Sequence, residues 1–190
     1  MDSIRRQLID ELLDRELSGL RGTAFDLGGE RSGARGTFSR DTFPQLDWTI
    51  VNIDESSRPD VLASLESLPF ENATADVVIL IEVLEHLQNP EQTLVEISRV
   101  LKPGGVVILT MPFLYQIHGD PQDYQRWTPE KIRNEMREGG FEELFISPMG
   151  DWKSVFFDLL RSIAHRSFQA GRNRQGAWTI RFLKALRPLV

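Results

Sequence analysis

Four short apolar runs, separated by segments with helical spacing, place the strongest constraint on the fold of this chain. The runs cover residues 23–27, 48–54, 75–81 and 106–111. Apolar residues recur three and four positions apart between the last two runs, over residues 90–101, as they do in residues 3–20 before the first. Strands that alternate with helices are joined by right-handed crossovers. The sequence therefore predicts an α/β fold with a mostly parallel central sheet flanked by helices.

Weaker signals complete the expected architecture. Residues 61–63 fit a short extra strand, and Thr128 fits the cap of a helix that opens at Pro129 and ends at Gly139. A last strand is expected over residues 141–147. The tail is expected to form two short helices around a break rich in Gly, Arg and Asn at residues 171–176. With 190 residues, the chain has the size of one domain with a short appendage. We place the main domain at 1–150, with 1–22 as its N-terminal helix, and a basic amphipathic helical tail at 151–190.

Charge is unevenly distributed along the chain. The net charge is −6, yet the segment from Lys153 to Val190 holds eight Lys or Arg and one acid, which leaves −13 on residues 1–152. The affinity of a protein for nucleic acid rests on neutralising phosphates, so the acidic body argues against such a partner. The basic tail has two interpretations. Packing on the sheet or in a homodimer is favoured, and contact with an anionic membrane surface is the alternative.

The chain contains no cysteine, which excludes disulfides, thiolate nucleophiles and cysteine-held metal clusters. The three histidines, His86, His118 and His165, are too scattered along the sequence to suggest a metal cluster, so no metal is expected. The charged N-terminus has no apolar core of the signal-peptide type, and no run is long enough to span a bilayer. A cytoplasmic protein, at most peripheral to the membrane, is expected.

Two motifs at the ends of predicted strands indicate a ligand site. Asp26-Leu27-Gly28-Gly29 follows the first strand, where glycine permits a tight turn and close approach of a ligand. Asp54 ends the second strand, where an acid can accept hydrogen bonds from both hydroxyls of a ribose. Ligands of open parallel sheets lie outside the carboxyl ends of the strands. The two motifs predict a nucleoside-type cofactor without choosing between a dinucleotide and S-adenosylmethionine.

Residues 68–111 distinguish these cofactors through ordered motifs. In chain order they are the turn Leu68-Pro69-Phe70, the strand that holds Asp76, the segment Val83-Leu84-Glu85-His86, and Arg99-Val100-Leu101-Lys102-Pro103-Gly104-Gly105. With these motifs the chain, over about residues 23–147, closely resembles the class I methyltransferases of the type 11 branch. The resemblance implies a Rossmann-like class I methyltransferase fold with S-adenosyl-L-methionine as cofactor. It also implies methyl transfer to a small-molecule acceptor, with a sugar or lipid-linked cell-surface intermediate as one class.

The resemblance also implies roles for single residues. The loop beside the methionine part of the cofactor would contain Asp26, Gly28 and Gly29, and Asp54 would hold the ribose. Ser64 and Leu65 would lie along the adenine, and Glu82 near the sulfonium. The glycine loop of the family usually reads D-x-G-x-G-x-G, whereas Glu30 and Ser32 stand at its second and third glycines here. This departure is the main support for an alternative, a non-catalytic scaffold or binding protein that retains the fold. A nicotinamide-dependent oxidoreductase is disfavoured because G-x-G-x-x-G is missing.

A polar, aromatic loop over residues 111–128 follows the last of the four main strands and is predicted to form a substrate lid. His118 is the first candidate for a base acting on the acceptor, because a histidine titrates near neutral pH. His86 is the second candidate. Asp120, Asp123 and Tyr124 are weaker ones. In the alternative, the loop only packs: Tyr124 and Trp127 anchor it, and Asp123 pairs with Arg126.

Overall fold

The computed structural model describes residues 3–31, 36–119, 122–142 and 144–169. The described residues fall into two compact units, one made of 3–12 with 148–169 and the other of residues 13–147. Helix α1 (Ile4–Leu17) contributes to both units. The first turns of α1 group with the C-terminal helix in this division.

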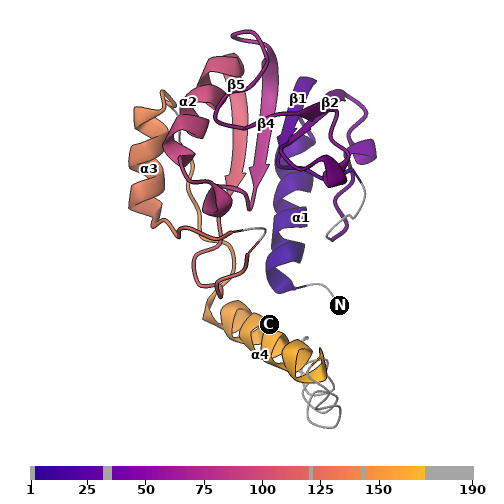
Figure 1. The fold of residues 1–190 in the computed structure, drawn as a ribbon, viewed down its shortest axis with the longest axis vertical. Helices are drawn as coiled ribbons and strands as arrows, with labels where there is room; N and C mark the ends of the chain where they lie inside the picture. Colours follow the sequence, from indigo (N-terminus) through magenta and orange to yellow (C-terminus); the bar gives the residue numbers. More distant parts are fainter. Residues whose placement is uncertain (1–2, 32–35, 120–121, 143, 170–190) are drawn as a thin grey trace. The chain divides into compact units, whose positions relative to one another are not determined.

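The larger unit is built on a five-stranded sheet in the order β3-β2-β1-β4-β5 (Figure 1). Every pair of neighbouring strands is parallel, as the alternation of strands and helices predicted. The strands are β1 (Gly22–Leu27), β2 (Leu46–Asn52), β3 (Val61–Leu62), β4 (Ala75–Ile81) and β5 (Leu101–Thr110). β5 starts five residues earlier than expected, because residues before Val106 already pair with β4 across an irregularity in register.

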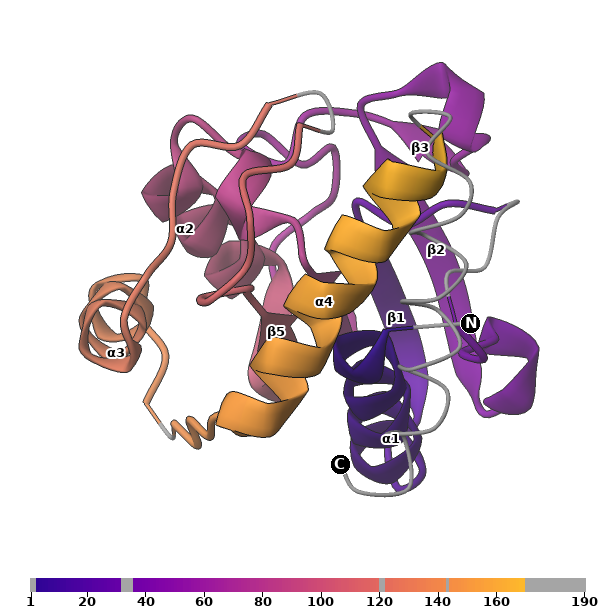
Figure 2. The same ribbon diagram turned by 90° about the horizontal axis from the view of Figure 1, so that it is seen from below.

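Helices α2 (Pro90–Val100) and α3 (Pro129–Glu138) lie side by side at the β5 side of the sheet in both views (Figures 1 and 2). Pro90 occupies the first turn of α2, where its missing N–H has no intrahelical partner to lose. The hydroxyl of Thr128 accepts a hydrogen bond from the amide of Lys131, so the predicted cap of α3 is confirmed. Short 3-10 turns connect the strands: η1 (Arg40–Thr42), η2 (Glu55–Ser57) and η3 (Leu84–His86).

The prediction of a strand over residues 141–147 was wrong, because the described residues of this segment form no strand. Phe141 and Leu144 pack against the core, three positions apart, while Phe145 is 89% exposed. A strand that packs on one face needs inward side chains every second residue. The inward spacing of three explains why the apolar content of this segment misled the prediction.

The motifs that carry the family resemblance hold one another in place. The guanidinium of Arg99 donates to the carbonyls of Leu68 (3.0 Å) and Phe70 (2.8 Å), and it pairs with Glu96 at 2.8 Å. Glu96 in turn accepts from the amide of Leu68 at 2.9 Å. Asp76 likewise pairs with Lys102 at 2.7 Å. These charged residues therefore have a structural role: they tie the turn at Leu68–Phe70 to α2, and β4 to β5.

Replacing Arg99 with methionine is expected to destabilise the fold by about 2 kcal/mol, since hydrogen bonds to a charged group each contribute about 1.5–3 kcal/mol and Arg99 is partly exposed. Urea unfolding followed by circular dichroism measures the change. Arg137→Met, at an exposed position in the last turn of α3, is the matched control. Equal midpoints for the two variants would show that the contacts of Arg99 contribute no stability.

The smaller unit joins the start of α1 to helix α4 (Trp152–Gln169). The carboxylate of Asp158 accepts from the amides of Ile4 (3.1 Å) and Arg5 (3.2 Å), so it caps the amino end of α1. Phe157 is buried against Ile4. Four large apolar side chains of α4 are instead exposed: Trp152, Phe156, Leu159 and Ile163.

The predicted break at 171–176 and the second tail helix lie outside the described residues. Within the part that the structure describes, no helix has the length and apolar character needed to cross a bilayer.

Candidate functional site

The order of the strands reverses between β1 and β4, and the loops that leave these two strands touch. Gly28 has a φ of +80°, and a Cβ added there would lie 2.6 Å from Cγ2 of Val83. A Cβ on Gly29 would overlap the carboxylate of Asp26. Both positions therefore favour glycine. A loop that binds a ligand closely where the strand order of a parallel sheet reverses needs glycine for the same reason.

Asp26 ends up buried at the base of this loop. Burial raises the pKa of its carboxyl to about 6, although Arg40 opposes the shift with Nη1 only 2.7 Å from Oδ2. Arg40 also donates to the carbonyl of Glu30, and Asn52 donates to the carbonyl of Gly29 at 3.0 Å. Nothing in the sequence spacing of Arg40 and Asn52 sets them apart, so neither was predicted as a site residue. Ser32 and Gly33 lie outside the described residues.

Asp54 lies just beyond the carboxyl end of β2, at the same sheet edge. It is exposed, and its carboxylate accepts from the amide (2.9 Å) and hydroxyl (2.6 Å) of Ser56. These bonds lower the pKa of Asp54 from its ordinary value, so the group is ionised and oriented at neutral pH. Its oxygens retain lone pairs that a ribose can use.

Ser64 and Leu65, predicted to lie along the adenine, follow β3 on this edge. The hydroxyl of Ser64 accepts from the amide of Glu66 at 3.3 Å. Leu65 is buried in the main hydrophobic core. The edge strands β2 and β3 pair through Asn52 and Leu62, which brings both predicted segments to the end of neighbouring strands.

Glu82, the first residue after β4, adopts a left-handed backbone with a φ of +58°. Such a conformation costs free energy in a residue with a side chain, and it concentrates at functional sites. The Glu82 carboxylate lies 3.4 Å from the hydroxyl of Thr110, at the end of β5. This contact joins the loop that leaves β4, where the cofactor sulfur is predicted to lie, to the end of β5, which leads into the predicted substrate loop.

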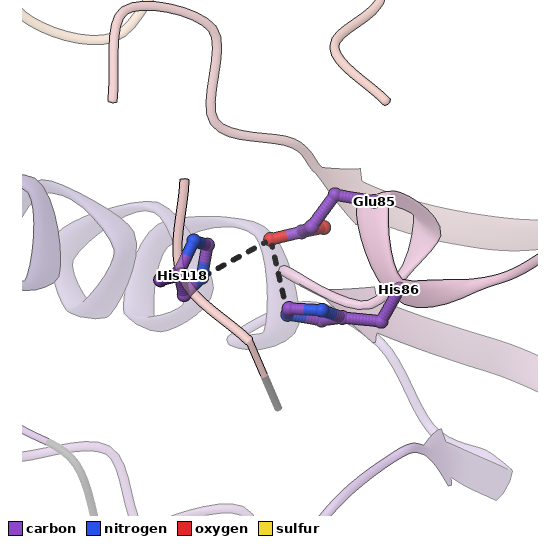
Figure 3. Close-up of side chains that lie close together, drawn as sticks. All are labelled: Glu85, His86 and His118. Carbon is purple, nitrogen blue, oxygen red and sulfur yellow. Dashed lines mark ion pairs between the residues drawn. The ribbon is translucent and has the colours of Figure 1, made fainter. Parts of the chain in front are cut away.

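Three residues gather directly after this loop, and Figure 3 shows them together: Glu85, His86 and His118. Nε2 of His86 lies 3.7 Å and Nε2 of His118 lies 4.0 Å from Oε1 of Glu85. The Glu85 side chain is fully buried, and the two rings meet edge to face with centroids 5.0 Å apart. The expectation that the histidines are too scattered to gather was wrong for these two. The side chain of His165 lies outside the described residues.

The loop over residues 111–128 reaches this cluster because hydrogen bonds join it to the residues of η3 and to Leu87. The carbonyl of Gln122 contacts Nδ1 of His86, and the amide of Tyr124 donates to the carbonyl of Glu85 at 2.8 Å. The Gln125 side chain donates to the carbonyls of Leu84 (3.1 Å) and Leu87 (2.9 Å). These contacts span more than thirty residues of sequence.

The side chain of Asp123 contacts neighbouring residues of the same loop. It forms a two-pronged ion pair with Arg126, and Oδ2 lies 3.1 Å from Nδ1 of His118. Arg126 holds the pKa of Asp123 far below its ordinary value. The Asp123–Arg126 pair of the packing alternative is thus present, and Trp127 is buried as that alternative expects. Asp123 is placed to orient His118 rather than to take up a proton.

Tyr124 is 45% exposed, and its hydroxyl bonds to the side chains of Gln88 (2.9 Å) and Gln122. Its role as an anchor is therefore limited to its backbone amide. Asp120, a weaker candidate, lies outside the described residues.

Known proteins match this chain by sequence and by fold. The family described as methyltransferase domain matches residues 42–109. An uncharacterized methyltransferase of Schizosaccharomyces pombe is 42% identical over 64 residues, which cover 34% of this chain and 23% of that protein. A ubiquinone/menaquinone biosynthesis C-methyltransferase of Ralstonia pickettii is 27% identical over 143 residues, with 57% of this chain and 58% of that protein covered. This chain thus spans less than two thirds of the length of these relatives.

Among solved structures, a phosphoethanolamine N-methyltransferase of Haemonchus contortus in complex with S-adenosyl-L-methionine has the same fold, with a TM-score of 0.63. The two are 19% identical, and the match covers 94% of this chain and 47% of that one. A parallel sheet in this order, with a glycine turn at its switch point, defines the Rossmann-like class. Within it, this chain matches the methyltransferase domain family over residues 42–109, a range that includes most of the motifs over residues 68–111.

Proposed function

We propose that this chain is an S-adenosylmethionine-dependent methyltransferase that acts on a small-molecule acceptor. The observation that carries the proposal is the pairing of the Gly28–Gly29 turn with an ionised Asp54 at one sheet edge. Bound there, S-adenosylmethionine supplies a methyl group already activated on a positively charged sulfur. The protein then needs only to hold donor and acceptor in line, which lowers a barrier by about 7–11 kcal/mol in favourable cases.

Calorimetric titration with S-adenosylmethionine and with S-adenosylhomocysteine tests this proposal. We expect saturable binding of both at one site per chain. A well-folded protein that binds neither ligand would favour the scaffold alternative, for which the replaced loop glycines are the support. A dinucleotide that stabilises the protein when S-adenosylhomocysteine does not would favour an oxidoreductase.

For the acceptor, we propose a sugar or lipid-linked intermediate that contacts the loop after β5. This loop exposes Phe113, Leu114 and Ile117, which supports an acceptor with an apolar part. We further propose that His118, and after it His86, activates the reacting atom. The support is that the nearby Asp123 orients His118 while Nε2 faces the cluster.

We also propose a role for the tail in packing or in a homodimer, ahead of contact with an anionic membrane surface. The exposed apolar side chains of α4 support an interface of some kind, and the basic residues from Lys153 onward are compatible with either partner.

The affinity for S-adenosylmethionine is expected to depend on pH through Asp26. Its pKa of about 6 means that the carboxyl is largely neutral below pH 6 and ionised above it. An ionised carboxylate attracts the ammonium of the methionine part, so affinity should rise as pH is raised from about 5 to about 7 and then level off. Calorimetry across this range measures the effect. Asp26→Asn should bind more weakly with a flat profile. An unchanged profile in that variant would assign the pH dependence to other groups.

A further inference from the structure

We propose that Glu85, His86 and His118 bind a divalent transition-metal cation, and that this cation holds a hydroxyl oxygen of the acceptor. The three side chains offer two imidazole nitrogens and one carboxylate oxygen, all within 4.8 Å of one another (Figure 3). This is the donor set that Zn²⁺, Mn²⁺ and Fe²⁺ accept in proteins. The proposal does not depend on the tail or on any residue outside the described part of the chain.

The spacing of the donor atoms suits a cation between them. Two ligand atoms held about 2.0–2.2 Å from one ion lie at most about 4.4 Å apart. The separations from Oε1 of Glu85 are 3.7 Å to Nε2 of His86 and 4.0 Å to Nε2 of His118. Each histidine can therefore share an ion with Glu85 with little movement of either side chain, and the two histidine ligand atoms lie within 4.8 Å of one another.

The outer contacts of both rings hold their Nε2 atoms toward the carboxylate of Glu85. Nδ1 of His86 contacts the carbonyl of Gln122, which can only accept, so this nitrogen carries the proton. Nδ1 of His118 lies 3.1 Å from the carboxylate of Asp123 and 3.5 Å from Nη2 of Arg126, so both groups fix the orientation of this ring. Metal-binding histidines are commonly oriented by such a carbonyl or carboxylate.

Burial makes a positive partner at this point favourable. The Glu85 side chain is fully buried, while the His118 and His86 side chains are 26% and 14% exposed. A cation placed among the carboxylate oxygen and the two imidazole nitrogens is attracted to all three atoms, and it adds to the positive charge that Arg126 supplies near Glu85. These three ligands leave at least one coordination position of such a cation for a further ligand.

The open position gives the cluster a chemical role. A cation there would bind the acceptor hydroxyl and lower its pKa. The new O–CH₃ bond forms as the S–CH₃ bond breaks, S-adenosylhomocysteine leaves as a neutral thioether, and the hydroxyl proton passes to water. His118 and His86 then act on the acceptor through the cation. The acceptor part of this inference rests on the proposed methyltransferase function, whereas the metal site does not.

Metal binding to the full chain, freed of metal with a chelator, tests the site directly. We expect Zn²⁺ and Mn²⁺ to bind at one equivalent in calorimetry, and Co²⁺ to give absorption bands of a nitrogen- and oxygen-bound ion. Glu85→Gln and His118→Gln, which nearly conserve shape, should each weaken Zn²⁺ binding at least about 100-fold. The third histidine supplies the matched control, since His165→Gln should bind Zn²⁺ as the parent chain does. Circular dichroism and S-adenosylhomocysteine binding check that each variant is folded.

The outcomes separate this inference from the proposed function. No metal binding by a chain that still binds S-adenosylhomocysteine would overturn the metal site alone. Metal binding that survives in Glu85→Gln and His118→Gln would also overturn it. A chain that binds metal at the cluster but no S-adenosylmethionine would retain the site and reject the methyltransferase. Methyl transfer that persists at full rate without metal would overturn the acceptor role.

Discussion

Replacing Asp54 with alanine is expected to weaken S-adenosylmethionine binding about tenfold or more. The carboxylate is exposed at the end of β2, ionised, and fixed by two hydrogen bonds from Ser56. An acid in this position accepts from both ribose hydroxyls, and each bond to a charged acceptor is stronger than one between neutral groups. Alanine removes both bonds and leaves the sheet edge otherwise intact.

Calorimetric titration of folded protein measures this effect. Glu55→Ala is the matched control, because it removes the same charge one residue further along, at another exposed position. The control should bind nearly as the parent chain does. Equal losses in both variants would point to net charge rather than to a ribose contact, and undiminished affinity in Asp54→Ala would remove the ribose role.

Replacing His118 with alanine is expected to lower turnover about 100-fold or more while the affinity for S-adenosylmethionine stays within about twofold. Groups that activate an acceptor contribute about 10²–10⁴-fold to rate. His118 lies in the loop after β5, against Glu85 and Asp123, and its contacts are separate from the Gly28–Asp54 edge. The loss should therefore appear in the rate and spare the cofactor.

Transfer of a labelled methyl group from S-adenosylmethionine into soluble and lipid extracts of cells measures turnover and separates the two acceptor classes. Gln116→Ala, two residues earlier in the same loop, controls for disturbance of the loop. Turnover equal to that of the parent chain in His118→Ala would dismiss this histidine from the reaction. A comparable loss in Gln116→Ala would mean that the loop conformation, rather than the imidazole, sets the rate.

The sequence by itself determined the elements whose signals are local. Apolar runs specified β1, β2 and β4, and Thr128 specified the start of α3, because strand period and cap chemistry involve neighbours only a few residues apart. The ends of these strands in turn placed Gly28 and Asp54 at one edge, since parallel strands share their carboxyl ends. Local apolar content misled over residues 141–147, where the described residues form no strand.

Only the tertiary structure decided which side chains of the later loop meet the earlier strands. His118 reaches Glu85 and His86 because Gln122 and Gln125 bond to η3 across 36 to 41 residues of sequence. Arg40 folds back on Asp26 across 14 residues in the same way. A hydrogen bond between distant residues depends on the whole path of the chain and leaves no periodic signal. The histidines therefore looked scattered in the sequence although two of them share one carboxylate in the fold.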